Sequence, residues 1–298
     1  MSWRILYIEE SEELTLYLDN VKVKRLLNEF TFPLSDIVLI LIDNYKTVLS
    51  VKLITMCANM NIPIVLCGDN HHPISIVHPL TGHYAGSKIL AEQINWSEEQ
   101  KMIIWREIIQ RKIAKQLFVL KCFSTIEAPQ RIIQEYIGHV EMGDVTNREG
   151  LAAKVYFRAL FGAEFSRNEE CVINACLNYG YSIFRAIISK VIVAKGLCPQ
   201  IGIFHRGAEN AFNLSDDILE LFRPIVDKVV YENFRNEKIF IREHRITLLK
   251  MLDHKIFFEK QHLTIHQVIE KTVDDLISYF RKGVIMSGLD YDPVLYDL

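Results

Sequence analysis

The sequence has few cysteines and none of the pairings that mark a disulfide-stabilised or zinc-binding domain. Small secreted domains need a dense cysteine framework, and zinc sites commonly need Cys-x-x-Cys pairs. Neither pattern occurs among the six cysteines of the chain, so they predict reduced, mostly buried thiols: Cys57, Cys67, Cys122, Cys171, Cys176 and Cys198.

Long apolar runs and an excess of one charge are also missing. The first ten residues, MSWRILYIEE, carry charges where a signal peptide needs an apolar run. No later stretch reaches the roughly 18 uncharged apolar residues of a membrane-spanning helix, so we expect a soluble, cytoplasmic protein. The 34 basic and 37 acidic residues give a net charge of −3, so any binding of nucleic acid must come from local basic faces.

What the chain does have is 298 residues that are 50% hydrophobic, enough for two domains. Short β-branched runs between turn signals predict a strand-rich first quarter: RILYI, LTLYLDNVKV, DIVLILID, IPIVLCGD and PISIVHP, all within residues 4–79. Within this region, helical spacing of apolar residues predicts one helix over residues 46–61, KTVLSVKLITMCANMN.

The pattern of apolar residues changes after HPLTGHYAGSK (78–88), a stretch with glycine, proline and histidine that is typical of a linker. The remainder consists of long amphipathic segments. We therefore predict an α+β protein in which a small β-rich N-terminal domain (1–85) is joined by a linker to a larger all-α domain (86–298). Residues 97–125 form one such helix, whose basic residues either meet phosphates or are simply solvated: Arg106, Arg111, Lys112, Lys115 and Lys121.

Candidate ligands for a metal ion gather in GIFHRGAENAFNLSDDILELFRP, residues 202–224. Asp217 and Glu220 are three apart, so a helix places them on one face. Two carboxylates that close repel unless a cation or a proton joins them, and Mg²⁺ or Mn²⁺ takes such oxygens readily. His205 precedes this helix and could share the ion, while Asn213 or Ser215 could cap the helix.

A further candidate ligand, Glu149, opens an Ala-rich helix in GDVTNREGLAAKVYFRALFG (143–162) that Thr146 or Asn147 could cap. From the pattern alone, Glu149 could equally be a capping or ion-pair residue. Several cations adjoin these ligands in sequence and could grip phosphates or pair with nearby acids: Arg148, Lys154, Arg158, Arg206 and Arg223. Tyr156 or Tyr179 could stack on DNA ends, although tyrosine in an apolar helix is usually buried.

Three separated blocks resemble a known family: NREGLAAKVYF (147–157), INACLNYGYSIFRAIISKVIVAKGLCPQIGIFHRG (173–207) and NLSDDILELFRPIVD (213–227). In order and spacing they are similar to the motifs of the CRISPR-associated integrases, the first-numbered Cas proteins. The resemblance covers the whole chain. CLNYGYSIF and NMNIPIVLCGDN look most like the type II branch.

The resemblance implies a site of Glu149, His205 and Glu220 binding Mg²⁺ or Mn²⁺, with Asp217 beside them. Many members have aspartate where Glu220 stands, which leaves open whether Asp216 or Asp217 touches the ion. The implied reaction is attack by the 3′-hydroxyl of a short captured DNA duplex on the phosphodiesters at the ends of a CRISPR repeat, a transesterification. His205 is then assigned as a ligand, with general base as the alternative role.

The resemblance also implies partners. These are double-stranded DNA, a second copy of the chain paired through the N-terminal domain, and the small second-numbered Cas protein, with two dimers flanking a central partner dimer. The type II effector nuclease and an accessory ring protein could join them.

Other interpretations stay open from the residues alone. DDILE (216–220) also fits the aspartate-rich helix of a Mg²⁺-dependent prenyl-diphosphate or terpenoid enzyme, which the strand-rich first quarter disfavours. The chain could also be a non-catalytic DNA-binding scaffold, or a metal-dependent nuclease acting on branched DNA. The histidines of NHHPISIVHPLTGH (70–83) suggest loop and linker rather than a metal site, and SGLDYDPVLYDL (287–298) suggests a peripheral tail.

Overall fold

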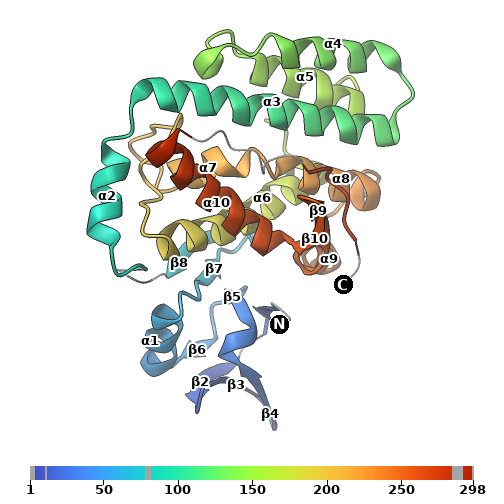
Figure 1. Ribbon diagram of the computed structural model, residues 1–298. Coiled ribbons are helices and arrows are strands. Elements are labelled where there is room, and N and C mark those ends of the chain that lie inside the picture. Colours follow the sequence, from blue (N-terminus) through green and yellow to red (C-terminus); the bar gives the residue numbers. More distant parts are fainter. Residues whose placement is uncertain (1–3, 11, 78, 80–81, 284–290, 297–298) are drawn as a thin grey trace.

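A computed structural model describes residues 4–10, 12–77, 79, 82–283 and 291–296. Figure 1 shows most of the strands gathered at the N-terminal end of the molecule and a largely helical part above them, with the long helix α3 (Glu98–Phe123) lying across it. This α+β arrangement confirms the predicted fold class. In the part of the chain that the structure describes, none of the helices has both the length and the apolar character to cross a lipid bilayer.

The N-terminal part contains two four-stranded sheets and one helix. One sheet has the order β1-β5-β7-β8, in which the first three strands are parallel and β8 is antiparallel; the other has the order β4-β3-β2-β6. The elements are β1 (Arg4–Ile8), β2 (Glu13–Tyr17), β3 (Asn20–Arg25), β4 (Asn28–Pro33), a 3₁₀ turn η1 (Leu34–Asp36), β5 (Ile37–Ile42), β6 (Val48–Leu49), α1 (Val51–Asn59), β7 (Ile64–Cys67) and β8 (Pro73–Val77).

The central strand β5 lies between two hydrophobic cores. All six of its residues are buried. Leu39 and Leu41 belong to the large core of the helical part, whereas Ile40 and Ile42 belong to a smaller core inside the N-terminal part. Because side chains of a strand alternate between the two faces of a sheet, this apolar run joins the two parts of the molecule.

The helix predicted over residues 46–61 is shorter than expected. Val48 and Leu49 form strand β6, and α1 begins at Val51. The Ser50 side chain accepts a hydrogen bond from the Leu53 N–H and caps the helix, which fixes its start after the strand. Strands β4 and β6 were both absent from the sequence-based prediction.

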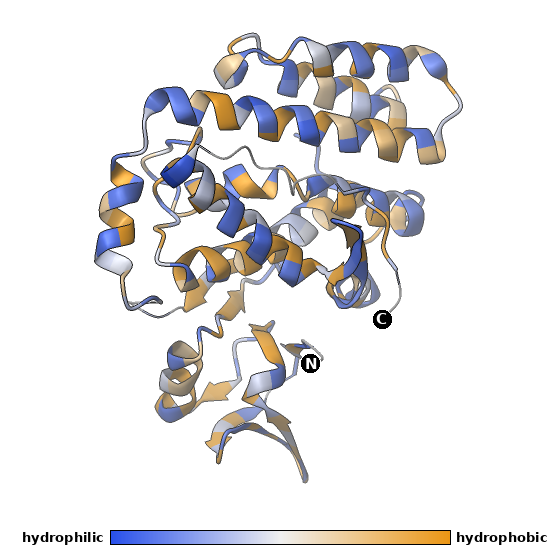
Figure 2. Ribbon diagram, in the orientation of Figure 1, coloured by the Kyte–Doolittle hydropathy of each residue, from blue (hydrophilic) through white to orange (hydrophobic). Residues whose placement is uncertain are grey.

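The helical part is built around α6. Its elements are α2 (Gly86–Ile94), α3 (Glu98–Phe123), α4 (Glu127–Gly138), η2 (Met142–Asp144), α5 (Arg148–Phe161), α6 (Val172–Ala194), α7 (Asn213–Leu219), α8 (Arg223–Phe234), α9 (Arg242–Lys250), η3 (Met251–Asp253), β9 (Lys255–Phe258), β10 (Gln261–Thr264) and α10 (Ile265–Lys282). The α6 ribbon is hydrophobic over most of its length (Figure 2), as expected of a helix covered on all sides.

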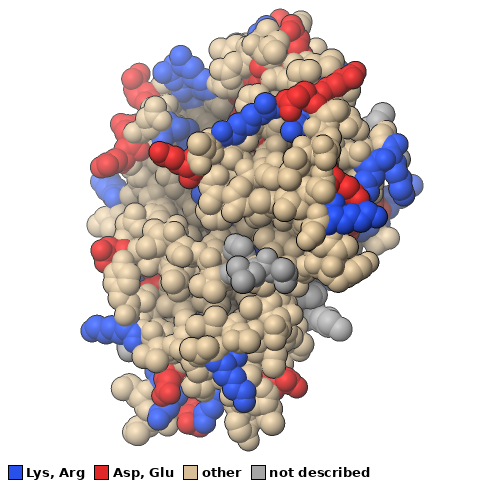
Figure 3. Space-filling model, turned by 90° about the vertical axis from the view of Figure 1, so that its left-hand side faces the viewer, with Lys and Arg blue, Asp and Glu red and all other residues tan. Residues whose placement is uncertain are grey.

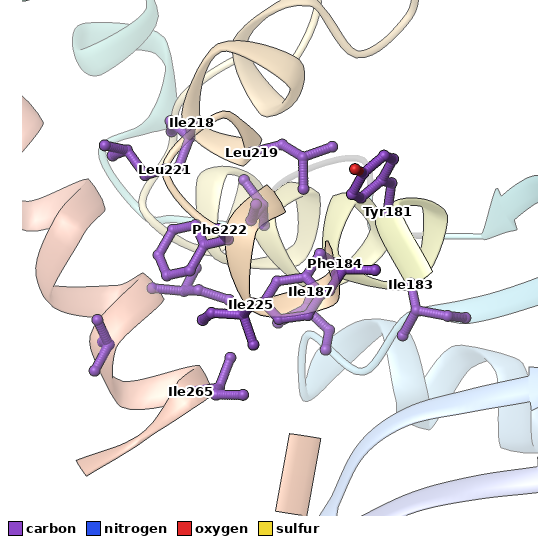
Figure 4. Packing of buried hydrophobic residues seen from close by; sticks show 14 of the residues in the cluster. Tyr181, Ile183, Phe184, Ile187, Ile218, Leu219, Leu221, Phe222, Ile225 and Ile265 are labelled. Atoms are coloured by element: carbon purple, nitrogen blue, oxygen red, sulfur yellow. The ribbon is translucent and has the colours of Figure 1, made fainter. Parts of the chain in front are cut away.

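Aromatic and aliphatic side chains of α6 meet those of the α7–α8 region. Phe184 and Phe222 stack with ring centroids 5.9 Å apart, and Ile187 and Ile225 lie beside them (Figure 4). Gly180 lets α8 approach α6, since a Cβ there would fall 2.5 Å from the Val226 side chain. The core thus fixes the segment that carries Asp217 and Glu220.

The C-terminal part departs from the prediction in two ways. It is not all-α, because β9 and β10 pair as an antiparallel hairpin. The stretch expected to be a peripheral tail is partly structural: Tyr291 is buried, bridges to Phe258, and donates its hydroxyl to the Leu221 carbonyl at 2.6 Å. A tyrosine can be buried in this way because its hydroxyl has a hydrogen-bond partner. Residues 284–290 and 297–298 of that stretch lie outside the described residues.

The two parts of the molecule are joined by a buried ionic network, here called the junction network: Tyr7, Glu9, Asp43, His71 and Arg245. Arg245 reaches from α9 to Glu9 at 3.0 Å and to Asp43 at 3.2 Å. Asp43 also accepts a hydrogen bond from the Tyr7 hydroxyl at 2.7 Å and contacts His71 Nδ1 at 2.9 Å. Both oxygens of this buried carboxylate are therefore occupied.

Candidate functional site

Two predicted site residues on different helices converge on one lysine. The Lys112 ammonium, on α3, lies 2.6 Å from Glu149 Oε1 on α5 and forms a second ion pair with Glu220 Oε2 at the end of α7. Arg223, at the start of α8, binds the other oxygen of Glu220 at 2.8 Å. These four residues are called the carboxylate–lysine cluster. The structure thus brings Glu149 and Glu220 together from positions 71 residues apart in the sequence.

The cluster keeps its charges although it is largely buried. The side chains of Lys112 and Glu220 are only 6% and 4% exposed, while that of Glu149 is 26% exposed and gives access from solvent. Burial opposes ionisation of Glu220, but Arg223 and Lys112 outweigh it and hold its pKa below the usual range. Burial likewise opposes the charge of Lys112, and Glu220 with Glu149 outweighs it, so that its pKa is raised.

Asp217 holds His205 and the loop before α7. Its Oδ1 lies 2.7 Å from His205 Nδ1 and accepts the His205 backbone N–H, and its Oδ2 accepts the N–H groups of Ile203 and Phe204. The hydrogen bond to Asp217 raises the pKa of His205, whereas burial raises that of Asp217 itself. The Asp217 contact takes Nδ1, which leaves Nε2 as the ring nitrogen that could bind a ligand.

The loop that carries His205 fits tightly around this carboxylate. A Cβ at Gly202 would fall 2.8 Å from Asp217 Oδ2 and 2.3 Å from the His205 carbonyl oxygen, so only glycine allows the approach. The predicted caps of α7 are both wrong. Asn213 donates to the Gln200 and Gly207 carbonyls, and the Ser215 hydroxyl pairs with that of Ser189.

The loop before α5 fixes Glu149 in the same manner. Asp144 accepts the backbone N–H groups of Arg148 at 2.8 Å and of Glu149 at 3.0 Å. Asn147 caps the helix by accepting from the Gly150 N–H, which confirms one of the two predicted caps. Gly143, Asp144 and Asn147 all have positive φ, a strained arrangement that the capping bonds stabilise.

The five cations predicted to bind phosphate have different surroundings. Arg223 binds Glu220, Arg206 pairs with Glu98, and the Arg148 guanidinium lies over the Tyr136 ring at 5.5 Å. Lys154 and Arg158 are exposed, one turn apart on α5. Beside His205 lies an open pocket of about 560 Å³, which Lys101, Arg206 and Asn210 help to line. On the face drawn in Figure 3, acidic and basic side chains are intermixed, as the small net charge suggests.

The structure contradicts several of the sequence-based expectations. Lys112 and Lys115 are buried, so the basic side of α3 is not simply solvated. Tyr156 and Tyr179 are buried in the core rather than placed to stack on DNA. Both oxygens of Asp216 are occupied, by Arg185 at 2.6 Å and Asn210 at 2.9 Å. DDILE therefore does not present an aspartate pair to a diphosphate.

A metal site is not pre-assembled. Among the described residues, no three His, Cys, Asp or Glu side chains come close enough to hold an ion together. This applies both to the predicted ligand set and to the described histidines near residues 70–83; His78 lies outside the described residues. One observation nonetheless suits a divalent ion: the carboxylates of Glu149 and Glu220 already face one cation, the ammonium of Lys112.

Sequence reasoning missed the two residues that organise this site. Lys112 was grouped with a basic helix face, because its sequence neighbours give no sign that α3 packs against α5 and against the segment that joins α7 to α8. Asp144 was missed because it lies outside the cap position, which Asn147 occupies, and it reaches the Arg148 and Glu149 N–H groups only because the chain turns sharply before α5.

Comparison with known proteins decides the family. The family model of the CRISPR-associated protein Cas1 matches residues 6–260. The chain belongs to the Cas1 family. A CRISPR-associated endonuclease Cas1 from Neisseria meningitidis is 33% identical over 290 residues, covering 95% of this chain and 93% of that protein. One from Francisella tularensis is 25% identical and covers 68% of this chain and 71% of that protein.

Solved structures share the Cas1 fold. A Cas1 protein from Thermotoga maritima superposes with a TM-score of 0.76 at 18% identity, covering 94% of this chain and 97% of that one. A casposase bound to an integration product gives a TM-score of 0.76 at 19% identity and covers 98% of this chain and 93% of that one. A Cas6-RT-Cas1–Cas2 complex gives 0.77 at 15% identity, covering 96% of this chain and 36% of that one.

Proposed function

We propose that this Cas1-family chain is a DNA integrase and endonuclease of CRISPR adaptation that inserts short foreign duplexes into a CRISPR repeat. The observation that carries the proposal is the convergence of Glu149 and Glu220 on one cation beside the His205 loop. The names of its relatives, endonuclease for the Neisseria protein and integration product for the casposase structure, support it.

The proposed reaction exchanges one phosphodiester for another. The 3′-hydroxyl of the incoming duplex forms a new P–O bond, the old P–O bond to a 3′-oxygen of the repeat breaks, and the proton of the attacking hydroxyl ends on the departing oxygen. No external energy source is needed, because one ester replaces another. With water in place of the 3′-hydroxyl, the same exchange is endonuclease cleavage.

The types of ligand in this chain, two carboxylates and one imidazole nitrogen, are ones that a Mg²⁺ or Mn²⁺ ion accepts. Bound there by Glu149, Glu220 and His205, the ion would supply charge stabilisation at the phosphate and at the departing oxygen. Asp217 is better described as a positioning residue than as a ligand, because its oxygens already bind His205 and three backbone N–H groups.

The basic residues around the site would neutralise its acids or bind the DNA backbone. Arg223 neutralises Glu220 inside the protein. Lys154 and Arg158 are exposed on α5, the helix that Glu149 opens, and could contact the DNA backbone together with Arg148 and Arg206. Because each phosphate contact releases counterions, binding should weaken steeply as salt concentration rises.

The proposed assembly has two dimers of this chain, paired through residues 1–85, flanking a dimer of a small Cas2 partner. The solved Cas6-RT-Cas1–Cas2 complex, with which this chain shares its fold, supports a Cas2 partner. The effector nuclease and accessory ring protein of type II systems are further proposed partners.

An integration assay tests the function. It uses a labelled duplex with free 3′-hydroxyls, a supercoiled plasmid bearing a CRISPR repeat and Mn²⁺, with and without the small partner. We expect wild type to join label to plasmid and Glu220→Gln or His205→Ala to lose this activity by about a thousandfold or more. EDTA or a blocked 3′ end should abolish the joining.

The control is DNA binding measured on the same variants. Variants that bind DNA like wild type while failing to join it would place the defect in the chemistry. A wild-type protein that binds DNA and joins no label under any of these conditions would leave a non-catalytic scaffold as the better description.

A further inference from the structure

Lys112 occupies the position that an ion between Glu149 and Glu220 would take. Its ammonium faces Glu149 Oε1 at 2.6 Å and pairs with Glu220 Oε2. A divalent ion binds carboxylate oxygens at about 2.0–2.6 Å. Because both cations would need the same oxygens, the ammonium and the ion exclude one another by contact distance and by charge.

The charges of the cluster point the same way. Lys112 and Arg223 balance Glu149 and Glu220, two positive groups against two negative ones. Adding a divalent ion to this neutral and largely buried set would raise its net charge to +2, and withdrawal of one cation would lower that costly excess to +1. Arg223 binds the other oxygen of Glu220 and also lies over the Tyr181 ring at 4.5 Å, so Lys112 is the cation that can leave.

The side-chain chemistry of lysine suits this role. An ammonium on a four-carbon stem is a point charge that can swing away, whereas a guanidinium binds in a fixed planar geometry. We propose that Lys112 is an internal counter-ion that holds Glu149 and Glu220 together in the metal-free protein, and that a divalent ion displaces it. This inference rests on the proposed metal-dependent function and assigns Lys112 as a positioning residue.

Removing the ammonium tests the proposal, because two possible roles of Lys112 predict opposite changes in the affinity for Mn²⁺. If Lys112 competes with the ion, Lys112→Met should bind Mn²⁺ about tenfold more tightly than wild type. If it only maintains the fold, the variant should bind Mn²⁺ more weakly. The measurement is isothermal titration calorimetry with Mn²⁺ alone, accompanied by the melting temperature with and without Mn²⁺.

The matched control is Lys115→Met, one turn further along α3. Lys115 is equally buried but lies over the Tyr291 ring at 3.5 Å and faces the Leu221 carbonyl. We expect it to leave Mn²⁺ affinity within about twofold of wild type. Lys112→Met should also be less stable than wild type without metal and gain more in melting temperature from Mn²⁺, because the ion replaces the missing positive charge.

The outcomes separate this inference from the proposed function. Equal or weaker Mn²⁺ binding by Lys112→Met, with wild type binding normally, overturns the counter-ion role and leaves metal dependence standing. Absence of binding by wild type and both variants overturns the two together. Binding by Lys112→Met alone supports the counter-ion role directly.

A second measurement uses the unaltered protein and does not depend on the variant folding. Amine acylation followed by mass spectrometry reports how accessible each lysine is. Labelling of buried Lys112 should rise several-fold on adding Mn²⁺, while labelling of Lys115 stays constant. Unchanged labelling of Lys112 at saturating Mn²⁺ would overturn the proposal.

Discussion

Two buried ionic networks in this chain contain similar groups but differ in how their charges are held. The junction network has two acids, Glu9 and Asp43, held by the guanidinium of Arg245. In the carboxylate–lysine cluster the two acids, Glu149 and Glu220, share the ammonium of Lys112. Arginine binds with a planar fork and lysine with a mobile point charge.

This difference matches what each place does in the molecule. At the junction, Asp43 has three side-chain partners and joins the N-terminal sheet to α9, so nothing there is arranged to exchange. In the cluster, the Glu149 side chain is partly exposed to solvent, and its charged partner is the ammonium of Lys112. The fixed cation, Arg245, therefore lies where the two parts of the molecule are held together. The cation that we propose to be exchangeable, Lys112, lies where we propose the chemistry.

Breaking the junction should have the largest effect on stability. Arg245→Met leaves Asp43 and Glu9 without their shared cation, and losing one partner of a buried ion pair costs about 3–5 kcal/mol. Urea denaturation at neutral pH measures this loss, and we expect Mn²⁺ to recover none of it. The control is Arg242→Met, an exposed partner of Glu9, for which a much smaller loss is expected, because exposed ion pairs contribute little to stability. Stability of Arg245→Met equal to wild type would mean that apolar packing alone joins the two parts.

The carboxylate–lysine cluster extends to a buried acid whose partner is neutral. Asp227 accepts a hydrogen bond from the Tyr181 hydroxyl, and the Tyr181 ring lies under Arg223. Burial raises the pKa of Asp227 from 3.8 to about 6. Since the folded protein favours the protonated acid, the stabilising contribution of this group is complete below about pH 4 and is lost as pH rises through about 6.

Asp227→Asn should remove that dependence. We expect the unfolding free energy of wild type, relative to the variant, to fall by about 3 kcal/mol between about pH 4 and pH 7, since one pKa unit corresponds to about 1.4 kcal/mol. Urea titrations of both proteins across this range give the difference. A constant difference would show that the fold does not raise the pKa of Asp227.

Loosening His205 should affect chemistry more than stability. Asp217→Asn replaces the acceptor that holds the imidazole and its loop, and loss of such an orienting group typically costs 10–100-fold in activity or metal affinity. Because Asp217 raises the pKa of His205, the variant should show a lower pKa of that ring by NMR titration. Asp216→Asn, at the neighbouring aspartate bound to Arg185, should lower the His205 pKa less, because Asp216 acts on the ring only through its charge and makes no hydrogen bond to it. An unshifted pKa in Asp217→Asn would contradict the positioning role.

The smallest effect is expected from a single hydroxyl at the junction. Tyr7→Phe removes the donor to Asp43 and leaves Arg245 in place, so about 1 kcal/mol should be lost. Thermal unfolding compares it with Tyr45→Phe, at an exposed tyrosine. A loss as large as that of Arg245→Met would mean that the hydroxyl, rather than the guanidinium, holds the network together.

Much of the fold followed from local patterns. RILYI and DIVLILID became β1 and β5, because short β-branched runs favour strands. β4 was missed because NEFTFP is almost wholly exposed and only Phe30 and Phe32 alternate with a polar residue, which is too short a pattern to indicate a strand. The β9–β10 hairpin was missed because its short strands lie among helical segments. Tyr291 gave no signal either, since its hydroxyl partner, Leu221, lies 70 residues away.

By itself, the sequence determined the α+β fold class, the Cas1 family through its three ordered motifs, and the candidates Glu149, His205, Asp217 and Glu220. Periodicity and motifs are local properties, so they can be read along the chain. Only the tertiary structure decided which of these groups face one another. Asp217 binds the His205 loop, and Lys112 on α3 lies between Glu149 and Glu220. Such pairings depend on how distant helices cross, which hydrophobic packing of the whole core fixes and no local pattern records.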